Sequence, residues 1–91
     1  MATWNHRIVQ KEIRVKGKVE ETYYEVHEAH YNSNGELCAI TEGAVPPVGE
    51  TVEELEEELQ RMIAACKKPI LIDGQIEFAT WDSDEDKDRE F

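Results

Sequence analysis

Residues 49–66, GETVEELEEELQRMIAAC, predict one amphipathic helix with a well-defined start, and this helix decides the fold. Thr51 and Glu54 match a capping box: the Thr51 hydroxyl accepts a hydrogen bond from the Glu54 amide, and Glu54 reaches back. Acids fill the first turns and bases lie late, which suits the helix dipole, and Pro69 ends the helix. Apolar side chains recur at spacings of three and four on one face: Val52, Leu55, Leu59, Met62, Ile63 and Cys66.

Three segments before the helix are rich in β-branched and aromatic residues and predict strands over residues 4–15, 22–31 and 37–45. Lys16-Gly17-Lys18 is the first turn, and Asn34-Gly35 is a strong hairpin signal. Residues 70–72 predict a further strand, and Asp73-Gly74 predicts a turn before a final strand over 75–81. The apolar parity shifts between Ile8 and Val9, so we expect an irregularity in the first strand.

This order of elements, βββαβ, predicts a two-layer α+β domain in which one helix packs on a mostly antiparallel sheet. A chain of 91 residues has room for one small domain, which we assign to residues 1–81, with an acidic, flexible tail over 82–91. The side chains expected in the core are Ile8, Ala29, Tyr31, Cys38, Ile40, Val52, Leu55, Leu59, Met62, Ile63, Ile70 and Ile72.

The two faces of the predicted sheet differ in what can cover them. Strand parity around the hairpin turn groups one set that the helix can cover: Ala29, Tyr31, Cys38 and Ile40. The other face carries the predicted partner-binding residues, Val26, His30, Leu37 and Ala39, with Tyr24 further back. An uncovered apolar face often marks a partner site, and a symmetric homodimer would cover it. Alternatively, a bulge in the second strand redistributes these side chains and the face is solvated.

The net charge of the chain argues against several classes of function. The chain has 21 acids and 10 bases, a net charge of −11, which argues against direct binding to nucleic acid or to an anionic membrane surface. No apolar run approaches the roughly 20 residues of a membrane span, and the N-terminus lacks a signal-peptide core. Cys38 and Cys66 are interpreted as reduced thiols of a cytoplasmic protein. Residues 1–18 are basic, which predicts complementarity with acidic elements of the chain or a surface for a charged partner.

No pattern predicts catalysis, a cofactor or a metal site. His27 and His30, with His6 and Cys38, could suggest a metal site, but His27 and His30 are three apart in a strand and point to opposite faces. The three histidines are therefore interpreted as surface or partly buried residues, and Cys38 as a packing residue. Residues 82–88, DSDEDKD, have Lys87 where a calcium loop needs glycine. Nucleotide-binding and hydrolase motifs are absent from the sequence. An enzyme or ligand carrier would need a deep pocket lined by His27, His30 or Tyr31.

Residues 49–55, with Leu59, Met62 and Ile63, resemble the G-x-T-x-E-E-[AL] helix start of HicB-like proteins. Residues 4–8, Asn34-Gly35 and 47–51 also look like a group of small bacterial proteins, and the resemblance covers residues 4–76. It implies a partial RNase H-like layer without nuclease residues and a sheet order of 3-2-1-4. HicB proteins bind a small RNA-cleaving toxin through this layer and operator DNA through a separate segment. Residues 77–91 are too short and acidic for that segment, which leaves protein binding.

The leading hypothesis is a non-enzymatic cytoplasmic protein-binding module of the HicB-like type, antitoxin-like and homodimeric. Its partners would be a second copy and a small basic protein, with no nucleic acid and no membrane. The alternative is an acidic inhibitor that imitates nucleic acid and occupies a basic groove on another protein. The acids that would carry this mimicry include Glu53, Glu57 and Glu58 on the helix, together with the tail.

Overall fold

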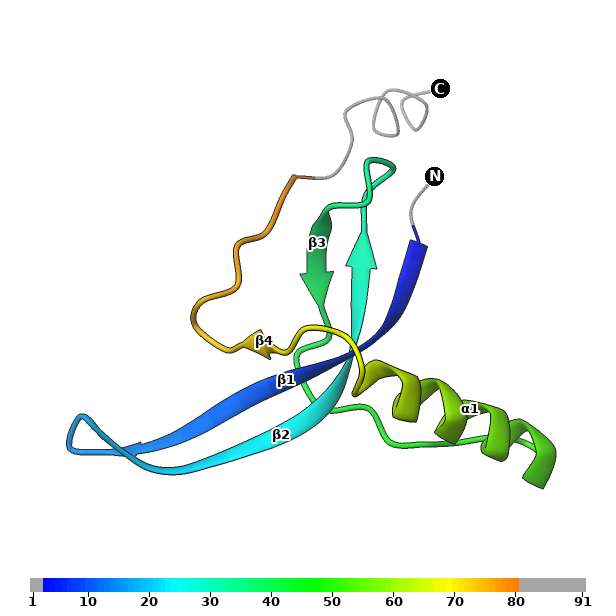
Figure 1. The fold of residues 1–91 in the computed structure, drawn as a ribbon, viewed down its shortest axis with the longest axis horizontal. Helices are drawn as coiled ribbons and strands as arrows, with labels where there is room; N and C mark the ends of the chain where they lie inside the picture. Colours follow the sequence, from blue (N-terminus) through cyan, green and yellow to red (C-terminus); the bar gives the residue numbers. More distant parts are fainter. Residues whose placement is uncertain (1–2, 81–91) are drawn as a thin grey trace.

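The computed structural model describes residues 3–80. Its elements are β1 (Thr3–Val15), β2 (Lys18–Tyr31), β3 (Leu37–Ile40), α1 (Val52–Ala65) and β4 (Leu71–Ile72) (Figure 1). The sheet has the order β3-β2-β1-β4, with β1 antiparallel to β2, β2 antiparallel to β3, and β1 parallel to β4. The α+β class, the βββαβ order and the 3-2-1-4 arrangement are confirmed. The tail over 82–91 lies outside the described residues.

The strands differ from their predicted bounds in three places. β2 starts at Lys18, because a tight turn with positive φ at Lys16 (53°) and Gly17 (80°) lets the ladder begin at once. β3 stops at Ile40 instead of residue 45, and residues 75–80 form no strand. The register of β1 with β2 shifts between Ile13 and Arg14, where Glu20 of β2 is the extra residue, so the irregularity expected near Ile8 and Val9 of the first strand is absent. Ile8 and Val9 stay in register and are both buried, since each faces a different covering segment.

Helix α1 lies on the face of the sheet that carries His6 and Ile8. The Nε2 atom of His6 is 2.7 Å from a carboxylate oxygen of Glu58 in α1. Ile8 pairs directly with Val26 across the β1–β2 ladder, and directly opposed residues share a face. The prediction that the helix covers the Ala29 face is therefore wrong. Strand parity sorts side chains into two sets, but it does not say which set the helix meets.

The four predicted partner-binding residues do not share an uncovered face, and all four are half-buried: Val26, His30, Leu37 and Ala39. His30 pairs with Ala39, and parity places both on the helix side together with Val26. Leu37 pairs instead with Tyr31, because the register shifts between His30 and Tyr31. The extra residue at this shift is Cys38 of β3, so this irregularity lies in the third strand and not in the second, where the alternative interpretation of the sequence expects a bulge.

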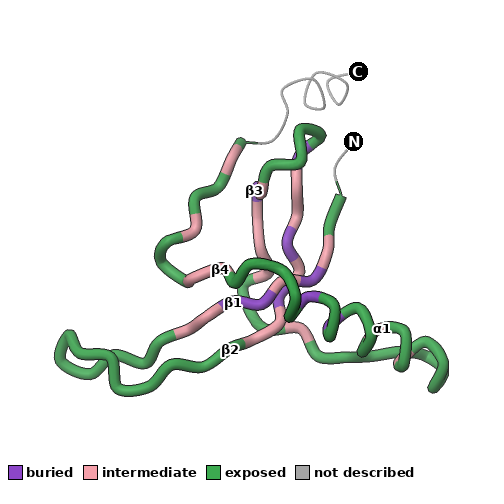
Figure 2. The backbone as a smooth tube through the Cα atoms, viewed as in Figure 1, coloured by how far each residue is buried: buried purple, intermediate pink, exposed green. Residues whose placement is uncertain are grey.

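Residues 69–80 cover the opposite face of the sheet. The Asp73 amide donates to the Gln10 carbonyl at the β1 edge (3.0 Å), and the Ala79 amide donates to the Leu37 carbonyl of β3 (2.7 Å). This segment thus runs from one edge of the sheet to the other (Figure 2). On this face, opposite α1, the side chains of Val9, His27 and Ala29 have 0% exposure. The centre of the sheet is therefore covered on both sides, and the free face predicted from the sequence is absent there.

The buried apolar core of the described residues is Ile8, Val9, Ala29, Cys38, Met62 and Ala65. Four of the twelve predicted core residues belong to it, and four more are half-buried: Tyr31, Ile40, Leu55 and Ile72. The remaining four are exposed, so their assignment to the core is wrong: Val52 (76%), Leu59 (42%), Ile63 (62%) and Ile70 (47%). Three of these four lie on α1, which meets the sheet with a different side from the one expected.

The start of α1 has the predicted cap, with one difference. The Glu54 amide donates to the Thr51 hydroxyl at 3.1 Å, while the Glu54 carboxylate accepts from the Glu50 amide at 3.0 Å, one residue before the cap. Thr51→Ala should lower the free energy of unfolding by about 1 kcal/mol, because the Glu54 amide loses its acceptor. Urea unfolding followed by circular dichroism measures this. Thr51→Ser keeps the hydroxyl and should stay near wild type, and an equal loss in both variants would contradict the assignment.

Candidate interaction surface

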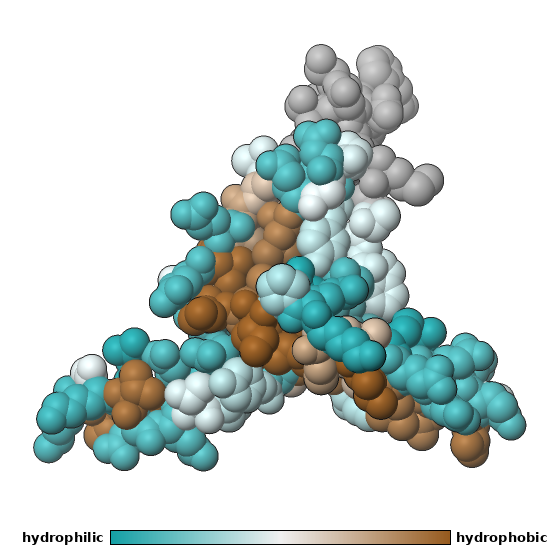
Figure 3. Space-filling model, viewed as in Figure 1, coloured by the Kyte–Doolittle hydropathy of each residue, from teal (hydrophilic) through white to brown (hydrophobic). Residues whose placement is uncertain are grey.

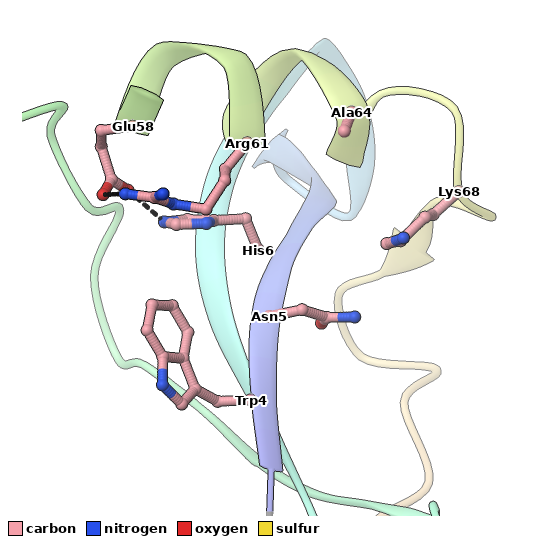
Figure 4. Close-up of a pocket in the computed structure, with 7 residues that line it drawn as sticks. All are labelled: Trp4, Asn5, His6, Glu58, Arg61, Ala64 and Lys68. Carbon is pink, nitrogen blue, oxygen red and sulfur yellow. Dashed lines mark hydrogen bonds and ion pairs between the residues drawn. The ribbon is translucent and has the colours of Figure 1, made fainter. Parts of the chain in front are cut away.

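The polar side chains between α1 and β1 satisfy one another. The Glu58 carboxylate contacts His6 Nε2 at 2.7 Å and accepts from Arg61 Nη2 at 2.9 Å. The Trp4 and His6 rings meet edge to face, with centroids 5.4 Å apart. An open groove of about 490 Å³ is lined by these residues together with Asn5, Ala64 and Lys68 (Figure 4). Because His6, Glu58 and Arg61 already pair, the arrangement serves as a joint between the helix and the sheet.

His27 is also structural. Its side chain is completely buried, with Nδ1 2.9 Å from the Thr41 carbonyl oxygen and Nε2 3.2 Å from a Glu25 carboxylate oxygen. The expectation that His6 and His27 are surface or partly buried residues is therefore wrong, since His6 is 4% exposed. Among residues 3–80, no three His, Cys, Asp or Glu side chains gather in a way that could hold a metal ion. The best-formed grooves of this part are lined by residues other than His27, His30 and Tyr31.

The apolar stripe of α1 is turned away from the sheet. Glu58, Met62 and Ala65 face β1, and the single methyl group of Ala65, 1% exposed, lets the helix approach closely. At 3.6 residues per turn, the centre of the exposed set lies roughly 110° around the helix axis from this contact side. We name the exposed set the helix stripe: Val52, Leu59 and Ile63. Figure 3 shows hydrophobic surface along the arm that α1 forms.

A second apolar surface lies where the C-terminus of α1 meets the base of the β1–β2 ribbon. This ribbon base groove has a volume of about 390 Å³. Tyr24, 57% exposed, and Ile70, 47% exposed, leave it open to solvent. Its other lining residues are Ile8, Glu25, Val26 and Cys66. Its lining is apolar apart from Glu25, which suits the docking of apolar side chains.

The two charged regions of the chain lie on different arms (Figure 1). The far end of the β1–β2 ribbon carries the bases Arg14, Lys16 and Lys18, which we name the basic ribbon tip, beside the exposed acids Glu20 and Glu21. Helix α1 extends in another direction. Arg14 pairs with Glu12 at 2.8 Å, whereas Lys16 and Lys18 have no ion-pair partner within residues 3–80. We define the acidic face of α1 as Glu53, Glu56 and Glu57. These three carboxylates also have no ion-pair partner within residues 3–80. The complementarity expected between the basic N-terminal segment and acidic elements of the chain is realised in part, since Lys11 pairs with Asp73 at 3.6 Å. Within residues 3–80 it does not extend to the acidic face of α1.

Comparison with known proteins adds no relative. No protein-family model matches the chain, and neither the curated proteins nor the solved structures contain a match. The resemblance to HicB-like proteins therefore stays a prediction. Within residues 3–80, no helix has both the length and the apolar character needed to cross a membrane.

Proposed function

We propose that this chain is a non-enzymatic, cytoplasmic protein-binding module of the HicB-like type that acts as a homodimer. The observation that supports this most directly is the helix stripe, with Val52 76% and Ile63 62% exposed on a well-capped helix. A surface helix normally turns its apolar side to the core, and here that side is left for a partner. Cys38 and Cys66 are both free thiols, which suits a reducing compartment.

A double substitution in the helix stripe tests the homodimer. Leu59→Gln/Ile63→Gln should weaken self-association at least about tenfold, because two apolar side chains would no longer be buried between copies. The fold itself should keep its stability, since both residues are already exposed and glutamine favours helices. Size-exclusion chromatography with light scattering over a concentration series measures the change.

The matched control is Glu42→Gln, an exposed position outside α1 and the ribbon, which should leave the dimer unchanged. A wild-type chain that stays monomeric even at about 100 µM would refute the homodimer. Equal weakening by the control and the double variant would show that the stripe is not the contact surface.

The acidic inhibitor is the second candidate, favoured by three carboxylates that have no ion-pair partner within residues 3–80: Glu53, Glu56 and Glu57. Glu58 does not contribute, because it already contacts His6 and Arg61. Mimicry would require binding to a basic protein that falls steeply with salt. Self-association through the helix stripe would depend less on salt, since its main contribution is apolar.

A further inference from the structure

The ribbon base groove cannot be filled by the helix stripe of its own chain. Cys66, at the end of α1, lines the groove, while Val52 lies 14 residues away on the same helix, or about 21 Å at 1.5 Å per residue. Ile63, at the other end of the stripe, is three residues from Cys66, so the stripe begins beside the groove and runs away from it along a rigid helix that cannot fold back. The chain thus carries an open apolar groove and an exposed apolar ridge that can meet only between two molecules.

The charges follow the same pattern. Among residues 3–80, Lys16 and Lys18 of the ribbon tip and the three carboxylates on the acidic face of α1 have no ion-pair partner. Two chains that each have a net charge of −11 repel one another. Contact between the basic tip of one copy and the acidic helix of another would offset this repulsion where the copies meet.

We infer that two copies exchange arms about a two-fold axis. The helix stripe of each copy occupies the ribbon base groove of the other, and each ribbon tip lies along the acidic face of the partner's α1. This inference rests on the proposed homodimer and specifies its geometry. A two-fold arrangement makes each of these contacts twice, so one chain supplies both halves of the match.

The surface available is close to what such a dimer needs. The exposed fractions of the apolar side chains on the stripe, the loop before it and the groove correspond to roughly 600 Å² per copy, near the about 800 Å² that each partner buries in a standard interface. These side chains are Tyr24, Val48, Val52, Leu59, Ile63 and Ile70. The ribbon tip and the acidic face would add polar area at the rim.

Reversing the charges of the ribbon tip, of the acidic face of α1, or of both tests the inference. Lys16→Glu/Lys18→Glu and Glu53→Lys/Glu57→Lys should each weaken the dimer about tenfold at low salt, because each places like charges opposite one another. The quadruple variant has the wild-type net charge with the pairs reversed, and it should recover most of the affinity. Glu42→Lys/Glu77→Lys, which changes the same number of exposed acids away from both arms, is the matched control.

A carbodiimide cross-link identifies the contact directly. In a mixture of isotopically light and heavy chains, mass spectrometry should find Lys16 or Lys18 of one copy joined to Glu53, Glu56 or Glu57 of the other. A dimer whose affinity is unaffected by both reversals, and that gives no such link, overturns the exchange of arms while the homodimer stands. A chain that is monomeric in all measurements overturns both proposals.

Discussion

His27→Ala should lower the free energy of unfolding by about 3 kcal/mol, a large part of the roughly 4–12 kcal/mol expected for a domain of this size. The imidazole is completely buried, so its removal leaves a cavity beside Ala29 and Val9. It also takes hydrogen-bond partners from the Thr41 carbonyl and the Glu25 carboxylate. Acceptors left unsatisfied near the core add to the loss.

The matched control is His30→Ala in the same strand. The His30 side chain is 37% exposed, and its Nε2 atom lies 3.7 Å from the nearest Glu28 oxygen. This variant should therefore stay within about 1 kcal/mol of wild type. Urea unfolding at one fixed protein concentration compares the two, since dimerisation also contributes to apparent stability. Similar losses in both variants would contradict the buried role of His27.

Gly49→Ala should destabilise the chain by about 2 kcal/mol, or a fall in Tm of roughly 8–16 °C. A Cβ atom built on Gly49 would lie 2.5 Å from the Leu55 nitrogen and 2.9 Å from the Glu54 carbonyl carbon. Both are backbone atoms of the first turn of α1, which cannot rotate away as a flexible side chain could. The loop before the helix would have to move outward and lose its contact.

Gly43→Ala is the control, because a Cβ atom at this position meets nothing within 4 Å. It should leave stability unchanged or raise it by up to about 1 kcal/mol, since alanine restricts the unfolded chain. In thermal unfolding, the Tm should therefore fall for Gly49→Ala and stay unchanged or rise for Gly43→Ala. A Gly49→Ala variant as stable as Gly43→Ala would show that the loop does not pack against α1 in solution.

Local patterns predicted the elements well. The cap at Thr51, the apolar spacing of α1 and the turns at Gly17 and Asn34-Gly35 depend on neighbours within a few residues. Each of these features can therefore be predicted from a few neighbouring residues of the sequence. The sheet order came from the resemblance to HicB-like proteins, and the structure has the same order.

The arrangement of the layers was not predictable in the same way. The side of the sheet that α1 covers depends on the contact of Glu58 with His6, a pair separated by more than fifty residues. The rotation of the helix depends on Ala65, whose small size allows close approach but gives no apolar signal. Residues 75–80 cover a face without strand pairing, so alternation could not reveal their role.

The buried polar residues were missed for a related reason. Asn32, 3% exposed, accepts from the Asn34 and Glu36 amides and donates to the Thr80 carbonyl. The burial of Asn32 could not be predicted from its neighbours, because the hydrogen bond to Thr80 depends on a segment 48 residues away. The sequence around His27 likewise gives no sign of burial, because its contact with Thr41 joins residues 14 positions apart.

The position of residues 69–80 late in the chain affects how the protein folds during translation. The hydrogen bonds of this segment to the rest of the sheet join residues 42 to 63 positions apart, as between Cys38 and Thr80 or Gln10 and Asp73. The hairpins and α1 leave the ribosome before residues 69–80 do, so the side chains of Val9 and Ala29 remain open to solvent until then. The nascent chain therefore passes through a stage with an unprotected apolar face, the kind of surface that chaperones engage.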